Sequence, residues 1–155
     1  MTAGGFDPQS GAYPAHVEPG GLGARFLARL IDGIIVGVVG SIVLFALHLQ
    51  SNIMVTGLFT GLLTFVYFVA FEVTQGWTPG KKLLGLSVHG PAGAAKPDVS
   101  QSAIRNAFTV LTIIPFVGGL LAFIAIVVIA VTINGSPTKQ GKHDELAGGT
   151  QVVKG

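Results

Sequence analysis

The most constraining feature of the sequence is an apolar stretch, Gly23–Val39, that nevertheless carries three charged residues. Arg25, Arg29 and Asp32 follow one another at i, i+4 and i+7, so a helix places all three on one face and the Asp32 side chain leans back toward Arg29. A charge in the hydrocarbon core of a membrane costs about 2.5–3.5 kcal/mol. We therefore expect a membrane helix whose charged face packs against the rest of the protein. The alternative for the two arginines is that they only flank the span, with their stems reaching the membrane surface.

The composition supports a membrane location for most of the chain. Of the 155 residues, 50% are hydrophobic and only 10% are charged, whereas soluble proteins have about 25% charged residues. The lipid bilayer is thus the first expected partner. The net charge of +2 is too small and scattered for nucleic-acid binding, and the absence of cysteine excludes disulfides and thiolate metal sites.

Two spans and their orientation can be predicted from the first half of the chain. The first runs from about Arg25 to Leu47 and the second from about Ile53 to Thr74, each near the ~20 residues needed to cross a membrane. Glu72 falls in the last turn of the second span. Residues 48–52 between the spans contain no Lys or Arg. Because positive residues stay inside, we expect the N-terminus and the segment after Glu72 to be cytoplasmic.

The third apolar region, Ala107–Ile133, has no charged residue and is interrupted by a proline and a pair of glycines. One long tilted span is possible. A hairpin is favoured, entering through Ser100–Ile114 with Ser100 as N-cap, turning at 115–119 and returning through Leu120–Asn134, because it keeps all nine Lys and Arg inside. Its first arm would reach only ~22 Å. The predicted fold class is an all-α membrane protein with three to four transmembrane helices, the third of them short or re-entrant.

A small cytoplasmic β element should accompany the helices. Leu83–Val88 and Thr150–Val153 read as short strands, and each is the most economical partner for the other. Residues 1–22, rich in Gly and Pro, are predicted to be a flexible cytoplasmic leader, and residues 23–154 a multi-pass membrane domain.

Three motifs together resemble the RDD family of small bacterial membrane proteins. ARFLARLID resembles the family's Arg and first Asp at Arg25 and Asp32, GWTPGKKLLGLSV its loop around a Gly-Lys pair, and KHDELAGGTQVV its closing segment with Asp144. The resemblance implies an integral protein of the bacterial inner membrane. It leaves the molecular function open, because transport and accessory roles have both been proposed for the family.

The charged residues of the membrane region should meet near the cytoplasmic face. The predicted intramembrane polar cluster comprises Arg25, Arg29, Asp32, Glu72, Arg105 and Asp144. With three cations and three carboxylates the cluster would be neutral, as buried charges require. It is interpreted as a clamp that holds the bundle together. The alternatives are an ion or proton relay through Asp32 and Glu72, and recognition of an anionic lipid or of a partner's charge.

No pattern typical of catalysis is present. The four histidines lie in separate segments without metal-ligand spacing, and no nucleophile elbow is found. We therefore expect no enzyme activity, no cofactor and no metal. The predicted function is an accessory or scaffolding subunit of a larger membrane protein complex, or a self-associating protein. The alternative is a small oligomeric transporter of ions or solutes.

Overall fold

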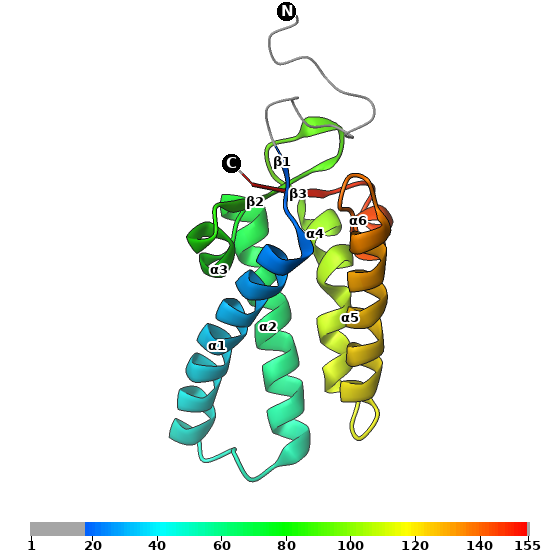
Figure 1. Cartoon of the computed structure of the whole chain (residues 1–155). Helices are drawn as coiled ribbons and strands as arrows, with labels where there is room; N and C mark the ends of the chain where they lie inside the picture. The colour runs from blue at the N-terminus through cyan, green and yellow to red at the C-terminus, as the bar shows by residue number, and fades with distance from the viewer. Residues whose placement is uncertain (1–17, 155) are drawn as a thin grey trace, which may run out of the picture.

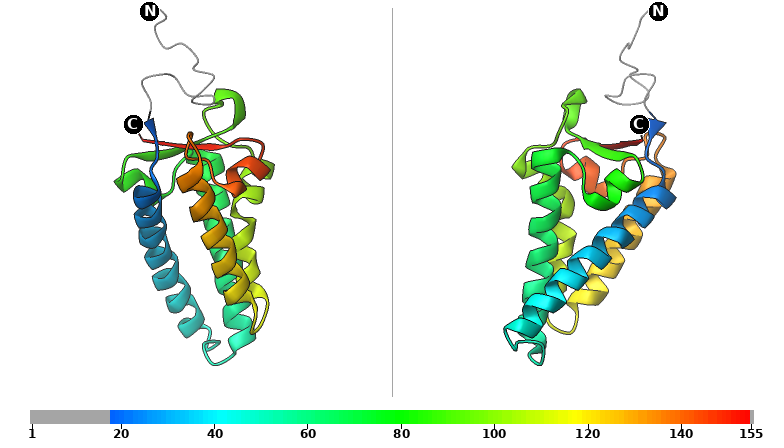
Figure 2. Two further views of the ribbon diagram at one scale, coloured as in Figure 1. Left: turned by 45° about the vertical axis from the view of Figure 1, so that its right-hand side comes forward. Right: turned by 90° about the vertical axis from the view of Figure 1, so that its left-hand side faces the viewer.

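Within residues 18–154, three helices, α1, α2 and α5, are long and apolar enough to cross a membrane. The structure is a computed structural model that describes residues 18–154. Its elements, in chain order, are β1 (Glu18–Pro19), α1 (Leu22–Ala46), α2 (Ile53–Gln75), α3 (Pro79–Leu83), β2 (Leu86–His89), η1 (Pro91–Gly93), α4 (Val99–Asn106), η2 (Ala107–Ile113), α5 (Gly118–Gly135), α6 (Lys142–Leu146) and β3 (Gln151–Lys154). The long helices run side by side, and the strands lie across one end of the bundle (Figures 1 and 2). We call this end the sheet end.

α1 and α2 form an antiparallel helix pair, as the sequence predicts. They contain 25 and 23 residues, which is enough to cross the hydrocarbon core. The Asn52 side chain caps α2 by accepting hydrogen bonds from the backbone N–H groups of Met54 and Val55, both at 3.1 Å. Gly76, with φ of 75°, ends α2 in the left-handed conformation that glycine adopts without steric cost. The turns before and after α2 are thus each specified by a local residue, Asn52 and Gly76.

The third apolar region forms the predicted hairpin, and the alternative of one long span is wrong. α4 and the 3₁₀ helix η2 run away from the sheet end, and α5 returns beside them (Figure 1). The outgoing arm, 8 residues of α4 and 7 of η2, reaches about 26 Å, slightly less than the ~30 Å hydrocarbon core. The predicted N-cap Ser100 is wrong. Asp98 is the N-cap, because its carboxylate accepts from Gln101 N at 2.8 Å while the Gln101 side chain accepts from Asp98 N in return.

The sheet has the order β1-β3-β2 and is antiparallel throughout. β2 pairs with β3, as predicted, with Val88 opposite Val152. The predicted start of this strand at Leu83 is wrong, because Leu83 ends α3 and β2 begins at Leu86. Leu86, Val88 and Val152 bury their side chains against Ala28 of α1. The sheet thereby anchors the first turns of α1.

The end of the predicted leader belongs to the fold. Glu18 and Pro19 form β1, which pairs with Lys154 and Val153 of β3, and α1 already begins at Leu22. Residues 18–22 are therefore ordered parts of the domain, contrary to the prediction. The rest of the predicted leader lies outside the described residues.

Candidate functional site

Asp32 lies on α1 with its carboxylate fully buried beneath α3. It accepts hydrogen bonds from Tyr67 Oη at 2.8 Å, from Thr78 Oγ1 at 2.5 Å and from the backbone N of Gly80 at 2.8 Å. Among residues 18–154 it forms no ion pair, and the predicted partner Arg29 is turned toward other groups. Three donors thus take the place of a cation in holding this carboxylate.

Close packing of α3 on α1 makes this arrangement possible. Thr78 is the N-cap of α3, with Pro79 in the first turn, so the Gly80 N–H is one of the free donors at a helix start. A Cβ at Gly80 would overlap the Ala28 carbonyl oxygen and lie 2.9 Å from the Asp32 Cγ. Position 80 therefore requires glycine, because the two backbones approach closely there.

Glu72, at the sheet end of α2, is the second buried carboxylate. Lys81 Nζ donates to it at 2.8 Å, Ser102 Oγ at 2.8 Å and Asn106 Nδ2 at 2.9 Å. Arg105 Nε forms a further ion pair at 3.2 Å. Glu72 thus joins α2 to α3 and α4 with each donor in hydrogen-bond or ion-pair range.

Asp144 of α6 is the third buried carboxylate, and Arg105 connects it to Glu72. The Nη1 atom of Arg105 pairs with Asp144 Oδ1, and Arg25 Nη1 lies 3.2 Å from Asp144 Oδ2. Thr150 Oγ1 donates to the same carboxylate at 2.9 Å, and the backbone N of Gly141 at 3.1 Å. Asp144 therefore ties the C-terminal segment to α1 and α4.

Arg29 differs from the other cations because no carboxylate pairs with it among residues 18–154. Its Nη2 donates to Asn106 Oδ1 at 3.3 Å. Its guanidinium carbon lies 3.7 Å from the ring centre of Phe68 and 4.9 Å from that of Phe108. These aromatic faces attract the cation without neutralising it.

The six residues of the predicted cluster all lie at the sheet end, but they do not form one unit. Arg25, Arg105, Glu72 and Asp144 make a connected ion-pair network. Asp32 is held separately by hydroxyl and backbone donors, so the predicted pairing of Asp32 with Arg29 is wrong.

The prediction also missed a cation that belongs to the network. Lys81 is 7% exposed and binds Glu72. The Gly-Lys pair in the GWTPGKKLLG segment was its only signal in the sequence. We use polar layer for the complete set, Arg25, Arg29, Asp32, Glu72, Lys81, Arg105 and Asp144. The polar layer has four cations and three carboxylates, so it carries one excess positive charge rather than being neutral.

Burial and neighbouring charges shift the pKa values of the groups at the sheet end. Burial lowers the pKa of Lys81 to about 8, although the Glu72 carboxylate opposes the shift. Burial alone would raise the pKa of Asp144, but the Arg105 and Arg25 guanidinium groups and the Thr150 hydrogen bond together outweigh burial and hold that pKa well below its usual range. His143 has its pKa lowered to about 3, mainly by burial, with Arg105 contributing. His143 is therefore neutral at physiological pH.

No group of three or more His, Asp or Glu side chains within the described part of the chain could hold a metal ion. The polar side chains are instead saturated mainly by one another. The arrangement ties the helices to the sheet and separates two types of carboxylate. One type is neutralised by cations, and the other, Asp32, is held by uncharged donors.

Apolar hairpins with a charged layer and a small sheet at one end define the chain as a multi-pass integral membrane protein. The RDD family model matches residues 19–148. The chain belongs to the RDD family. No curated protein and no solved structure matches it.

Proposed function

We propose that this RDD protein is a non-enzymatic accessory or scaffolding subunit of a larger membrane protein complex. The observation that carries the proposal is the confinement of charge to one end of the bundle. Beyond Asp32 in α1 and before Glu72 in α2, neither helix has a charged residue, and η2 and α5 have none. A single copy therefore offers no charged route across the membrane, whereas a structural role needs only a stable bundle and an adhesive surface.

The surface of α1 supports a partner helix as the contact. Gly33 and Gly37 are exposed, and nothing lies within 4 Å of a Cβ built at either. Their spacing of four residues places them on one helix face, where small residues allow another helix to approach closely. Exposed apolar residues, among them Ile34 and Val38, flank these two glycines.

We further propose that the protein resides in the inner membrane of a bacterial cell with both termini in the cytoplasm. The segment between α1 and α2, residues 47–52, contains no Lys or Arg. The described chain ends, Glu18 and Lys154, pair in the sheet and therefore lie on the same side. Charge asymmetry supports the sheet end as the cytoplasmic one.

Asp32 supports the alternative function, a small oligomeric transporter of ions or solutes. It is a buried carboxylate without an ion pair among the described residues, and such groups are common carriers of protons and cations in membranes. Several copies would be needed to complete a pathway, because one copy lacks further charged groups toward the opposite end.

Two measurements separate these functions. First, the protein is purified in a gentle detergent and the bound proteins are quantified by mass spectrometry for wild type, Gly37→Leu and the control Gly119→Leu. Gly119 is equally open, so the control adds the same side chain to α5. We expect a stoichiometric partner in wild type and in the control, and its loss in Gly37→Leu.

Second, the purified wild type in liposomes is tested for proton and monovalent-cation flux with a fluorescent dye. The accessory role predicts no flux above empty liposomes. Flux that disappears in Asp32→Asn would overturn the proposal and establish transport. If Gly37→Leu and Gly119→Leu lose the partner to the same extent, the α1 face that carries Gly37 is not the contact surface.

A further inference from the structure

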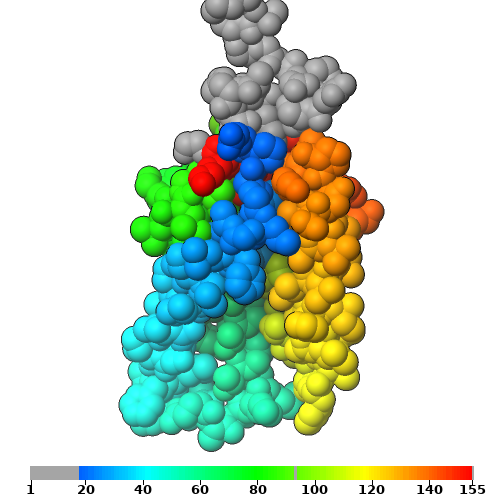
Figure 3. Space-filling view, in the orientation of Figure 1, coloured from blue at the N-terminus to red at the C-terminus, as the bar shows by residue number. Residues whose placement is uncertain are grey.

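An open groove separates α1 from α5 at the sheet end of the bundle. Its cavity volume is about 440 Å³, within the range of small-molecule sites. The hollow between the two helices is visible in the space-filling view (Figure 3). Its apolar wall comprises Phe26, Leu30 and Ile34 of α1 with Ile126, Ile129 and Ile133 of α5. We call it the α1–α5 groove.

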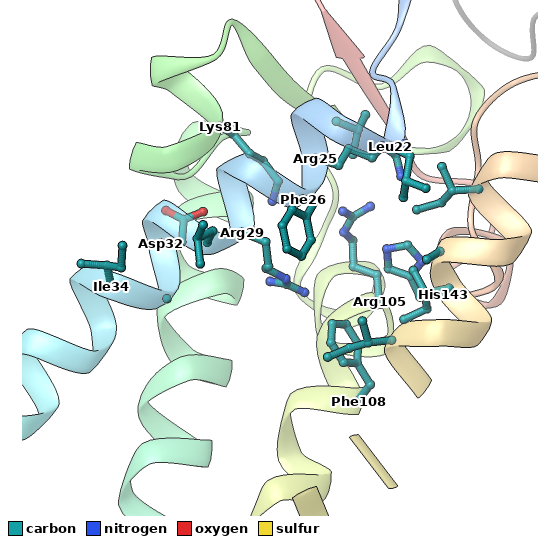
Figure 4. Close-up of a pocket in the computed structure, with 17 residues that line it drawn as sticks. Leu22, Arg25, Phe26, Arg29, Asp32, Ile34, Lys81, Arg105, Phe108 and His143 are labelled. Carbon is teal, nitrogen blue, oxygen red and sulfur yellow. The ribbon is translucent and has the colours of Figure 1, made fainter. Parts of the chain in front are cut away.

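One end of the groove is cationic. Arg25, Arg29, Lys81 and Arg105 contribute to its lining. Figure 4 shows the guanidinium groups of Arg29 and Arg105 and the imidazole of His143 directed into the space between the helices. The groove thus combines a positive end with a long apolar wall.

Two polar atoms at this end are buried without a hydrogen-bond partner among residues 18–154. They are Nη1 of Arg29 and Nδ1 of His143. Burying such atoms without a hydrogen-bond partner is unfavourable, and more so for the charged one. The unpaired Arg29 N–H group and the excess positive charge of the polar layer call for an anion, and the Nδ1 atom of neutral His143 adds a place for a hydrogen-bonding group.

The carboxylate that lines the groove does not supply this anion. The Asp32 oxygens are already occupied by Tyr67, Thr78 and Gly80. In Figure 4 the Asp32 carboxylate lies on the α3 side of α1, away from the guanidinium of Arg29. Arg29 lines the groove, and no carboxylate among residues 18–154 pairs with it.

We propose that the α1–α5 groove binds one acidic glycerophospholipid, with its phosphate against Arg29 and one acyl chain along the apolar wall. The wall follows α1 from Leu22 to Ile34, about 18 Å, which is close to the ~15 Å depth of one leaflet of the hydrocarbon core. Guanidinium groups bind phosphate oxygens in a bidentate manner.

The two ends of the groove together select this ligand. A soluble phosphate would satisfy the cations but leave the apolar wall uncovered. A zwitterionic lipid would cover the wall but bring its own cation beside the arginines. Of these three ligands, the acidic lipid matches both ends. The lipid proposal does not require the accessory role, but the groove shares Gly33 and Ile34 with the α1 face proposed for a partner helix.

The test uses the full-length protein, delipidated in detergent and then supplied with dioleoyl-phosphatidylglycerol, dioleoyl-phosphatidylcholine or soluble glycerol 3-phosphate. Native mass spectrometry measures bound lipid, and thermal unfolding measures stabilisation. We expect one phosphatidylglycerol per chain, at least tenfold preferred over phosphatidylcholine. The unfolding temperature should rise with phosphatidylglycerol alone.

Two variants, each with a matched control, locate the site. Arg29→Gln removes the phosphate contact, and Ala130→Trp fills the apolar wall while leaving every charge in place. Lys142→Gln removes an exposed positive charge on α6, and Val131→Trp adds the same ring at an exposed position of α5 outside the groove. We expect at least a tenfold loss of bound phosphatidylglycerol in the first two variants and no change in the controls.

The remaining outcomes overturn the proposal. Equal retention of phosphatidylcholine would show that the cationic end does not recognise the lipid. Equal stabilisation by glycerol 3-phosphate would identify a site for a soluble anion. An undiminished signal in a folded Ala130→Trp variant would place the lipid elsewhere, and that variant decides the question even if Arg29→Gln fails to fold.

Discussion

The Lys81–Glu72 ion pair gives the sharpest test of the polar layer as a structural clamp. In Glu72→Gln the amide oxygen can still accept from Ser102 and Asn106, but the amide NH₂ group then faces Lys81 Nζ, donor against donor. Arg105 also loses one of its two carboxylates. Breaking a buried pair by removing one partner costs about 3–5 kcal/mol, so we expect a loss of that size in the free energy of unfolding.

A double-mutant cycle isolates the contribution of the pair. Lys81→Met leaves Glu72 with Arg105, Ser102 and Asn106, so its cost should be smaller, about 1.5–3 kcal/mol for one charged hydrogen bond. In the Lys81→Met background there is no ammonium group at position 81, so Glu72→Gln no longer leaves a buried cation without its carboxylate. The cost of Glu72→Gln should therefore fall by about 1–3 kcal/mol in this background.

The free energies are measured by titrating the protein in dodecyl maltoside with sodium dodecyl sulfate and following circular dichroism. Lys82→Met is the matched control. Lys82 is exposed and lies over the Trp77 ring, 4.2 Å from its centre, so its loss should cost no more than about 1 kcal/mol. If the Glu72→Gln cost is the same in both backgrounds within about 0.5 kcal/mol, Lys81 and Glu72 do not stabilise one another and the clamp is refuted.

Three further predictions follow from the same geometry. Asp32→Asn should cost about 1–3 kcal/mol in the same titration, because an amide offers one acceptor oxygen to three donors; an unchanged free energy would show that the carboxylate is dispensable for the fold. Gly80→Ala should destabilise by about 1–3 kcal/mol, since its Cβ overlaps the Ala28 carbonyl oxygen, and an alanine variant as stable as wild type would contradict the close approach of α3. Stability should also fall as the pH drops below about 6.5, because the unfolded chain protonates His143 at its ordinary pKa while the folded pKa is about 3. The loss should reach about 2 kcal/mol near pH 5 and should shrink in His143→Gln, and a pH profile identical in the two proteins would exclude His143 as its source.

The sequence by itself determined the first two transmembrane helices and favoured the hairpin. Membrane insertion depends on the apolar character of about 20 consecutive residues, which is a local property of the chain. For the third apolar region, the length left one long span open, and the hairpin was favoured because it places all nine Lys and Arg on one side. The pairing of β2 with β3 was also predicted, because few other β-branched segments lie outside the apolar membrane regions.

Helix caps and short strands were harder to predict from the sequence, because several neighbouring residues can serve as the cap. Asp98 and Ser100 are both good N-caps, and only the reciprocal contact with Gln101 selects Asp98. The strand β1 has two residues and no periodic signal. It forms because β3 presents a free edge to it, which the sequence of β1 does not encode.

The partners of the charged residues were decided by the tertiary structure. Asp32 and Arg29 are one turn apart, and local spacing favours their pairing. Close packing at Gly80 instead brings the donors of α3 to Asp32, while Phe68 and Asn106 hold Arg29 on the other side. Which cation meets which carboxylate depends on how separate helices pack, and sequence spacing describes only one helix at a time. The excess positive charge beside the α1–α5 groove became visible only when Lys81 took its place in the polar layer.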